Sequence, residues 1–320
     1  MKENLATEFF LLGGNGFIGT ALSRRLLEKG NSVTVLDPMP PRDPSFRGRW
    51  IPGKLEDHQL GEKILRRGMR VVHLAWSSLP EPSNRDPHGD LSSNLLPTLR
   101  WLDACAEAGV DKLIFMSSGG TVYGVPVTDP IREDHPTDPI CSYGISKLAV
   151  EKYLSLYGLL RGLPSFVLRA SNVYGPGKDP FGRQGAINVF LGAMARNERI
   201  EIWGDGRVVR DYLYIADLVD LVVRCLEFGT SCQERIFNAG FGKGHSLLDI
   251  LEQIRIVTGR PPEIEWHEGR KVDVPANVLD IGRAHAVFGW RPRVSLEEGV
   301  GETWEWVRNY HKSHQEEGDR

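Results

Sequence analysis

Tyr143 and Lys147, in the stretch YGISK, have the spacing of two side chains on one face of a helix. A tyrosine titrates near pH 10 in water, so work as a base near pH 7 requires its pKa to fall by roughly three units. An ammonium group beside the phenol favours the phenolate form and lowers that pKa. The pair is therefore a candidate for general acid/base catalysis.

Hydroxyl groups gather in a second stretch, FMSSGGTVYG, residues 115–124. A short apolar run ends there in two serines, two glycines and a threonine. Strands often end in Ser and Gly, so a plain flexible turn is one interpretation. The other is that one hydroxyl takes part in chemistry beside the tyrosine.

Glycines of the stretch GGNGFIG predict a dinucleotide site. Gly13, Gly16 and Gly19 follow the first expected strand and open a helix, where backbone amides can approach a pyrophosphate. A second strand then ends at Asp37, whose carboxylate can accept hydrogen bonds from a ribose and would repel a 2′-phosphate. We expect NAD rather than NADP, although Arg42 in the next loop could soften that preference. The alternative is an ordinary strand–turn–helix connection.

The elements that must position these groups alternate between strand and helix. Strands are expected at 8–14, 32–37, 69–76, 111–118 and 164–171, and helices at 17–30, 93–110, 142–162 and 215–229. Pro97 must lie in the first turns of its helix or kink it. The strand at 111–118 is apolar throughout, as expected when both faces are buried. The pattern predicts an α/β fold, a Rossmann-type doubly wound parallel sheet, with a smaller α+β substrate-binding C-terminal portion.

The chain divides, on this interpretation, into interleaved portions. Residues 1–172 form the dinucleotide-binding domain, with returning segments near 209–238, and 173–310 form mainly the substrate-binding portion. Residues 311–320 are a polar tail, expected to be disordered.

Composition narrows the function classes. The 320 residues are 41% hydrophobic, and the net charge of -3 with no long basic run argues against nucleic acid as a partner. Four sparse cysteines, scattered histidines and the absence of ligand spacing predict no metal and suit a reducing cytoplasm. The first apolar run follows acidic residues and breaks into glycines, unlike a signal peptide, and no run could span a membrane. His73 is expected to be a core histidine.

Several blocks in order resemble the extended short-chain dehydrogenase/reductases, in particular the nucleotide-sugar epimerase/dehydratase group. They are GGNGFIG, HLAW, SSGGTVYG, YGISK, LRASNVYGPG, GDGRVVRDY, FNAG, EGRKVDVPANVLD and FGWRPRVSLEEG. The resemblance covers about residues 8–310. It implies bound NAD, a nucleotide-sugar substrate and a homodimer formed by the helices near 94–108 and 143–161.

The resemblance also implies roles for single residues. Tyr143 would be the acid/base, Lys147 would hold the nicotinamide ribose, and Ser118, with Thr121 as the second candidate, would bond the sugar's 4-oxygen. Gly119 and Gly120 would let the backbone pass close to the substrate. The implied NAD-binding residues are Gly13, Gly16, Phe17, Ile18, Gly19, Asp37, Leu55, Leu74, Ala75, Asn94, Tyr143 and Lys147. The implied substrate-binding residues are Ser118, Asn172, Gln184, Gly185, Ala186, Ile202, Trp203, Arg210, Tyr212, Arg270, Asp273 and Asn277.

Two departures from the family pattern concern the cofactor. Many relatives have an aspartate near GKLED that meets adenine, where this chain has Lys54 before Leu55, and Asp57 could compensate. A lysine common after the third strand is replaced by Ser78.

The reaction is indicated by what the serine-rich stretch lacks. Dehydratases and decarboxylases of this group carry an acid just before the Tyr-Gly, whereas no carboxylate lies between Ser118 and Tyr123 here. This favours C4 epimerisation of a UDP-sugar by transient oxidation, rotation of the 4-keto sugar and hydride return. Asn277 is smaller than the tyrosine that restricts the sugar pocket, so glucose/galactose forms or their N-acetyl forms are expected. The alternatives are another nucleotide-sugar enzyme of the group (sugar-acid epimerase, reductase or dehydratase) or a non-catalytic nucleotide-sensing module.

Overall fold

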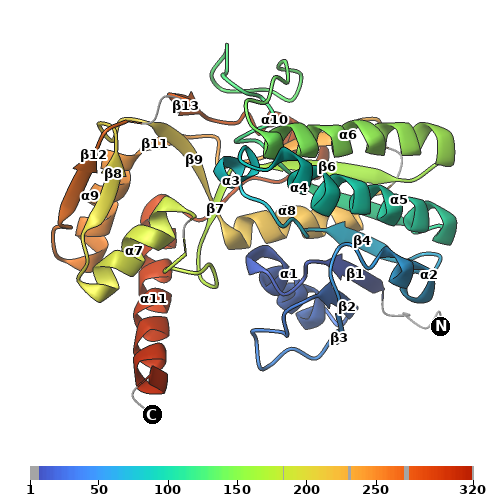
Figure 1. Cartoon of the computed structure of the whole chain (residues 1–320), viewed down its shortest axis with the longest axis horizontal. Coiled ribbons are helices and arrows are strands. Elements are labelled where there is room, and N and C mark those ends of the chain that lie inside the picture. The colour runs from blue at the N-terminus through green and yellow to red at the C-terminus, as the bar shows by residue number, and fades with distance from the viewer. Residues whose placement is uncertain (1–6, 183, 230–231, 270–273, 319–320) are drawn as a thin grey trace.

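Seven parallel strands form the central sheet of the protein (Figure 1). The computed structural model describes residues 7–182, 184–229, 232–269 and 274–318. The strand order across the sheet is β10 (Ile236–Ala239), β6 (Ser165–Ala170), β5 (Lys112–Ser118), β4 (Arg70–His73), β1 (Glu8–Leu12), β2 (Ser32–Asp37) and β3 (Arg49–Pro52). This doubly wound arrangement confirms the predicted fold class.

Both faces of the sheet are buried, which explains why its strands are continuous apolar runs. Phe9 and Leu11 pack on one face, and Phe10 and Leu12 pack on the other. The helices that cover the first face are α1 (Phe17–Glu28), α8 (Ile215–Glu227) and α10 (Gly282–Phe288). Those that cover the second are α2 (Gly61–Ile64), α5 (Leu96–Ala108) and α6 (Ser142–Arg161).

The rest of the chain forms a smaller α+β portion beside the sheet (Figure 1). Strand β9 (Val209–Tyr214) pairs with β7 (Asn172–Tyr174), β11 (Gly244–Ser246) and β13 (Ala276–Asn277). A separate pair joins β8 (Ile200–Trp203) and β12 (Ile264–His267). The helices of this portion are α7 (Ala186–Arg196), α9 (Leu247–Thr258) and α11 (Leu296–Gly318). Strand β10 and helices α8 and α10 return to the large sheet, and the boundaries of a two-domain division stay a prediction.

Three local features differ from the sequence prediction. Strand β3 was not expected, since its residues RWIP lie at the edge of the sheet, are mostly exposed and form no apolar run. Between the strand expected at 69–76 and the helix expected at 93–110, where no element was predicted, the chain forms the short helices α3 (Pro80–Ser83) and α4 (Pro87–Asp90). The expected disordered tail is wrong as far as Gly318, because α11 continues there. Rings at helical spacing stack along it, Trp306 on Tyr310 at 4.9 Å and Tyr310 on His314 at 4.0 Å between centroids.

Pro97 occupies the second position of α5, directly after a π-helical segment, Leu91–Leu95. Because proline cannot donate to the carbonyl four residues earlier, a changed hydrogen-bond pattern at this point is expected. π-Helical turns are frequent at functional sites. This one contains the buried Asn94 and packs against α6.

His73 is the core histidine that the sequence predicted. Its side chain is fully buried, its Nε2 lies 3.0 Å from the Thr98 hydroxyl, and burial lowers its pKa to about 3. It is therefore neutral at physiological pH. Among the described helices, none has the length and apolar character needed to cross a bilayer.

Candidate active site

The glycine-rich turn after β1 is packed so closely on its neighbours that side chains would not fit at two of its glycines. A Cβ on Gly13, whose φ is +78°, would lie 2.6 Å from the amide nitrogen of Ala75. A Cβ on Gly19 would lie 2.5 Å from Cα of Gly14, so α1 packs closely on the turn. Gly16 caps α1 without a side-chain hydrogen bond. The first amides of the helix therefore remain available to an anion such as a pyrophosphate.

Asp37 ends β2 beside this turn, as predicted. Its carboxylate oxygens accept hydrogen bonds from the backbone N–H groups of Asn15 and Met39, each at 3.0 Å. These bonds fix the carboxylate and leave further lone pairs for hydroxyl groups of a ribose. The turn, the open helix terminus and the acid together fit a dinucleotide such as NAD.

Tyr143 and Lys147 lie on one face of α6, one turn apart. The amide of Tyr143 donates to the Ser83 hydroxyl at 2.9 Å, which anchors the start of α6 to α3. The Lys147 ammonium is almost fully buried and donates to the carbonyl of Met116 on β5 at 2.8 Å. The predicted pair is therefore held against the end of β5.

Burial governs the protonation of this pair. It lowers the pKa of Lys147 to about 7 against the opposing effect of Glu151 and Asp90. Burial, with smaller contributions from Cys141 and Asp90, raises the pKa of Tyr143 above its usual value. The Tyr–Lys spacing led us to expect a lowered pKa for Tyr143, whereas the protein without cofactor raises it. A phenolate near pH 7 thus needs positive charge beyond that of the chain.

The serine-rich stretch forms the end of β5 and the turn after it. Ser118 and Thr121 both line the cleft described below, and Thr121 Oγ1 is a buried atom without a hydrogen-bond partner within the described residues. The Asn277 amide donates to the carbonyl of Gly119 at 3.1 Å and holds this turn. A Cβ on Gly119 would lie 2.5 Å from Leu279. Gly119 is thus packed against the protein interior, whereas Gly120 lies on the cleft wall.

One cleft of about 800 Å³ brings most of the predicted residues together. It lies at the carboxyl ends of β1, β4 and β5, where ligands bind in open α/β sheets. The predicted residues on its wall are Gly13, Gly16, Phe17, Ile18, Gly19, Leu74, Ser118, Tyr143, Lys147, Asn172, Gln184, Gly185, Arg210 and Asn277. Among described residues, no group of three or more His, Cys, Asp or Glu side chains could hold a metal.

Other predicted residues are not among those that line this cleft, namely Asp37, Leu55, Ala75, Asn94, Ala186, Ile202, Trp203 and Tyr212. The Leu55 side chain is buried in the core, and its carbonyl accepts from the Trp101 indole at 2.8 Å. Asn94 is fully buried, and its amide oxygen accepts from the backbone of Ser77 at 2.8 Å, so it shapes the wall instead of lining it. Arg270 and Asp273 lie outside the described residues.

The sequence analysis missed more than ten residues of the cleft wall, and two of them carry groups that bear directly on the chemistry of the site. Trp76 follows Leu74 and Ala75 in the block HLAW, so its neighbours were named while its own ring was not considered. Lys178 lies in a loop rich in Gly, Pro and Asp, a composition that gives no sign of a ligand-facing residue. Its ammonium donates to the carbonyl of Val173 at 2.7 Å, and burial lowers its pKa to about 8.

A buried ion pair supports the site from behind. Arg169 on β6 donates to Glu151 on α6 at 2.7 Å, and both side chains are almost completely buried. Glu151 also accepts a hydrogen bond from the hydroxyl of Ser117 on β5. Three elements that carry or border the catalytic groups therefore meet at one carboxylate.

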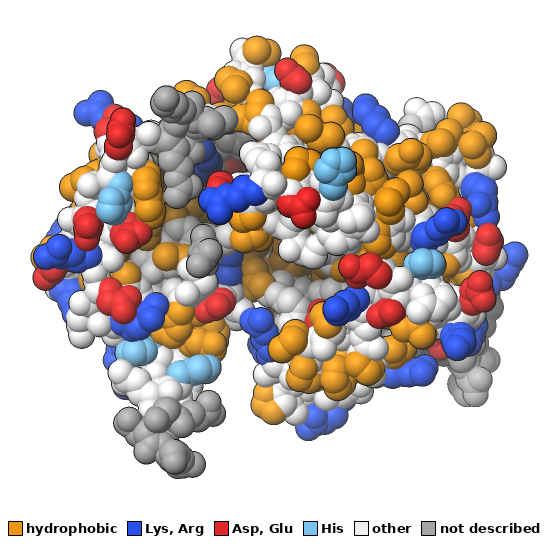
Figure 2. Space-filling model, in the orientation of Figure 1, with side chains coloured by type: hydrophobic (Ala, Val, Ile, Leu, Met, Phe, Trp, Pro, Cys, Tyr) orange, Lys and Arg blue, Asp and Glu red, His pale blue; other side chains and the backbone are white. Residues whose placement is uncertain are grey.

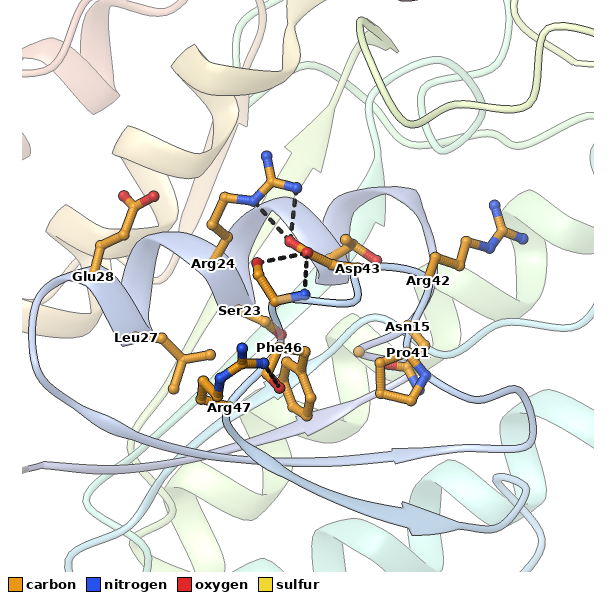
Figure 3. A pocket seen from close by; sticks show the side chains of 13 residues that line it. Asn15, Ser23, Arg24, Leu27, Glu28, Pro41, Arg42, Asp43, Phe46 and Arg47 are labelled. Atoms are coloured by element: carbon orange, nitrogen blue, oxygen red, sulfur yellow. Dashed lines mark hydrogen bonds and ion pairs between the residues drawn. The ribbon is translucent and has the colours of Figure 1, made fainter. Parts of the chain in front are cut away.

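A second cavity, of about 180 Å³, lies between α1 and the loop that follows β2 (Figure 3). Arg24 donates to Asp43 there at 2.8 Å, and Ser45 donates to the same carboxylate at 2.6 Å. These hydrogen bonds, that of Ser45 first, lower the pKa of Asp43 to about 2. Neither Tyr143 nor Lys147 lines this cavity, and the charged pair inside it, Arg24 and Asp43, is already joined.

Comparisons with known proteins agree with this geometry. Residues 9–240 match the model of the NAD dependent epimerase/dehydratase family. A UDP-glucose 4-epimerase of Mycolicibacterium smegmatis is 35% identical over 306 residues, which cover 93% of this chain and 97% of that protein.

Solved structures show the same similarity over nearly the whole chain. A Thermotoga maritima UDP-glucose 4-epimerase with UDP-glucose has a TM-score of 0.90 at 35% identity, and covers 95% of this chain and 100% of its own. A Thermus thermophilus UDP-glucose 4-epimerase in complex with NAD has a TM-score of 0.86 at 34% identity, with 94% and 99% covered. Because both the family model and these relatives extend over most of the chain, the protein belongs to the NAD dependent epimerase/dehydratase family.

Proposed function

We propose that the protein is an NAD-dependent nucleotide-sugar 4-epimerase, an isomerase, and that its substrate is a UDP-sugar. The observation that carries this is the meeting of the dinucleotide turn, the Tyr143–Lys147 pair and Ser118 on one cleft. Relatives named UDP-glucose 4-epimerase, and solved relatives with UDP-glucose or NAD, support the same assignment.

Each catalytic group has a place in the proposed reaction. Tyr143 removes the proton from the sugar's 4-hydroxyl and later returns it, while Ser118 donates a hydrogen bond to the same oxygen. Lys147 supplies positive charge beside the phenol. NAD, held by Gly13, Asp37 and the start of α1, supplies the redox chemistry that lets the sugar carbon be oxidised and reduced again. Reduction from the opposite face inverts C4.

The absence of an acid in the turn after β5 favours epimerisation over dehydration. Elimination of water requires a group that protonates the leaving hydroxyl. Among the described residues that line the cleft, Glu81 on α3 is the single carboxylate. It forms an ion pair with Arg85 at 2.6 Å. The turn itself contributes hydroxyls and glycines.

Cations on the wall suit the diphosphate of a nucleotide sugar. Arg210 and Lys178 both line the cleft, and guanidinium and ammonium groups pair well with phosphate oxygens. We assign Arg210 and Arg270 to the substrate diphosphate, with Tyr212 beside Asn172 near it, and Asp273 to the nucleoside ribose. Gln184, Gly185 and Ala186, with Ile202 and Trp203, form the proposed nucleotide pocket.

Asn277 supports a pocket that admits an N-acetyl group. Its side chain is buried on the cleft wall, and its amide oxygen has no hydrogen-bond partner within the described residues. An unpaired buried carbonyl favours a donor on the ligand, such as an acetamido N–H.

The test is to incubate purified protein with a panel of nucleotide sugars and to follow inversion at C4 by NMR without added cofactor. We expect turnover of a UDP-sugar, and Asn277→Tyr should abolish turnover of the N-acetyl forms while sparing UDP-glucose. Accumulation of NADH or of a 4-keto product would indicate a reductase or dehydratase instead. Absence of inversion for every UDP-sugar, with NAD bound, would refute the proposal.

A homodimer through α5 and α6 is the second part of the proposal. Leu156, Leu159 and Leu160 on the outer face of α6 are exposed, as is Leu96 at the start of α5. Figure 2 shows hydrophobic side chains gathered over this part of the surface. Contiguous exposed apolar surface of this kind marks an interaction site.

We also propose a reducing cytoplasm as the compartment. Cys105, Cys141, Cys225 and Cys232 are all free thiols, and two of them are buried. Free buried thiols are typical of reducing compartments.

A further inference from the structure

Three aromatic rings surround the buried ammonium of Lys147. The Trp76 ring is the nearest, with its centroid 3.8 Å from Nζ, and the rings of Phe115 and Tyr143 follow at 4.8 and 5.6 Å. Trp76 also meets Tyr143 edge to face, with the ring centroids 5.9 Å apart. The indole therefore contacts both members of the catalytic pair.

A chain of hydrogen bonds fixes the indole in this place. Its Nε1 donates to the hydroxyl of Ser78 at 3.1 Å, and Ser78 donates in turn to the buried carboxylate of Asp90. The second oxygen of Asp90 accepts from Ser142 and Ser146 on α6, at 2.9 and 2.6 Å. The ring and the catalytic helix are thus tied to the same carboxylate.

The ring face opposes the cost of burying the lysine charge. An aromatic face attracts a cation, and the attraction grows where water is excluded. The other titratable groups around the ammonium are Glu151 and Tyr143 on α6, Asp90 at the end of α4, and neutral His73 on β4. Glu151 is already paired with Arg169, and Asp90 with three hydroxyls. Of the three rings, the indole of Trp76 therefore lies closest to the Lys147 ammonium and stabilises its charge most.

We propose that Trp76 is a positioning residue for the catalytic pair: its face keeps the Lys147 ammonium in place and protonated, and its edge-to-face contact with Tyr143 sets that ring beside the ammonium. The proposal rests on the proposed function only in taking Tyr143 and Lys147 as the catalytic pair. The contact itself is a property of the protein and can be measured without substrate.

The first measurement uses the unaltered chain. Lysine labelled with ¹³C at Cε is incorporated, and the Lys147 resonance is assigned by its loss in Lys147→Arg. Protons above an indole face are shielded by the ring current, so the Lys147 ε-methylene protons should lie upfield of those of exposed lysines such as Lys152. A resonance at the position of the exposed lysines would overturn the proposal.

Two substitutions then separate the ring from the space it fills. Trp76→Phe keeps an aromatic face, and Trp76→Leu does not. Loss of the face leaves the charged form less stable, so in Trp76→Leu the pKa of Lys147 should fall by about one unit, a tenfold change in its protonation equilibrium. As the pH is raised, activity that requires the ammonium should then begin to fall at a lower pH than in the unaltered protein. The basic limb of the kcat/KM profile should therefore move to lower pH by a similar amount.

The controls exclude a merely structural effect. Thermal midpoints and NAD affinity are measured for all variants, and Trp76→Phe should stay near the unaltered protein in both the lysine titration and the pH profile. A folded Trp76→Leu protein with an unmoved Lys147 titration would overturn the proposal. If no UDP-sugar is turned over, the lysine titration still decides it, so its failure is distinguishable from failure of the proposed function.

Discussion

Two hydroxyls of the turn after β5 compete for the hydrogen bond to the reacting sugar oxygen. Ser118 ends the strand and lines the cleft beside Tyr143, whereas the Thr121 Oγ1 is buried and unpaired within the described residues. Both residues are half-buried and line the cleft. We favour Ser118 because it is the last residue of β5, the strand against which Lys147 is held.

The residue-scale prediction compares Ser118→Ala with Thr121→Val. We expect Ser118→Ala to lower kcat about 100-fold, because a donor aimed at developing charge is lost, and Thr121→Val to change it much less. Both are measured by C4 inversion with the best substrate of the panel. Full activity of Ser118→Ala together with loss in Thr121→Val would reverse the assignment.

At the scale of elements, the site depends on how α6 is held against β5 and β6. The buried pair of Glu151 and Arg169 joins α6 to β6, and the Ser117 hydroxyl adds β5. The guanidinium also lies 4.7 Å from the ring centroid of Tyr123, in the turn that follows β5. One charge pair therefore organises the strand end that carries Ser118 and the helix that carries Lys147.

The element-scale prediction follows from the cost of an unpaired buried charge. Arg169→Met or Glu151→Leu alone should lower the free energy of unfolding by about 3–5 kcal/mol, and the double variant by less than the sum. Urea unfolding measures all three. The exposed pair Arg255–Glu252 is the control, and its removal should change stability little. Additive losses in the double variant would show that the two side chains act independently.

At the scale of the whole molecule, the exposed leucines of α6 concern assembly. The sequence of α6 carries an apolar stripe at helical spacing that either core packing or an interface would explain, Tyr153, Leu156, Tyr157 and Leu160. In the structure the Tyr157 hydroxyl is tied to Asp103 at 2.7 Å, whereas the leucines remain exposed. Tyr157 of the stripe is therefore used in a contact within the chain, whereas Leu156 and Leu160 are left exposed on the surface.

The molecular prediction is that Leu156→Arg converts a dimer into a monomer. Light scattering should give about twice the chain mass of 35.8 kDa for the unaltered protein and the single mass for the variant. Leu248→Arg on α9 is the matched control, since Leu156 and Leu248 are 43% and 41% exposed. A monomeric unaltered protein would refute the dimer, and a monomeric control variant would show that the effect is nonspecific.

Local signals were sufficient for the sheet strands of the first half except β3, for α1, α5, α6 and α8, and for the dinucleotide turn. These segments are long or strongly periodic, and glycine spacing is a property of neighbouring residues. The helices of residues 80–90 escaped prediction because four-residue helices carry no period. The helical tail was not predicted because its polar composition indicated disorder. The spacing of Trp306, Tyr310 and His314, whose rings contact one another along the helix, was not considered.

The sequence by itself determined the fold class, the cofactor-binding turn with its acid, and the Tyr143–Lys147 pair, because these depend on periodicity and short spacing. Tertiary structure decided which side chains share the cleft. It buried Asn94 and Leu55 away from the cleft, packed Gly119 against Leu279, and placed Trp76, from the loop after β4, over the ammonium on α6. Such contacts join residues far apart in the chain, and a local sequence pattern therefore cannot predict them. The same packing buries Lys147 and so lowers its pKa.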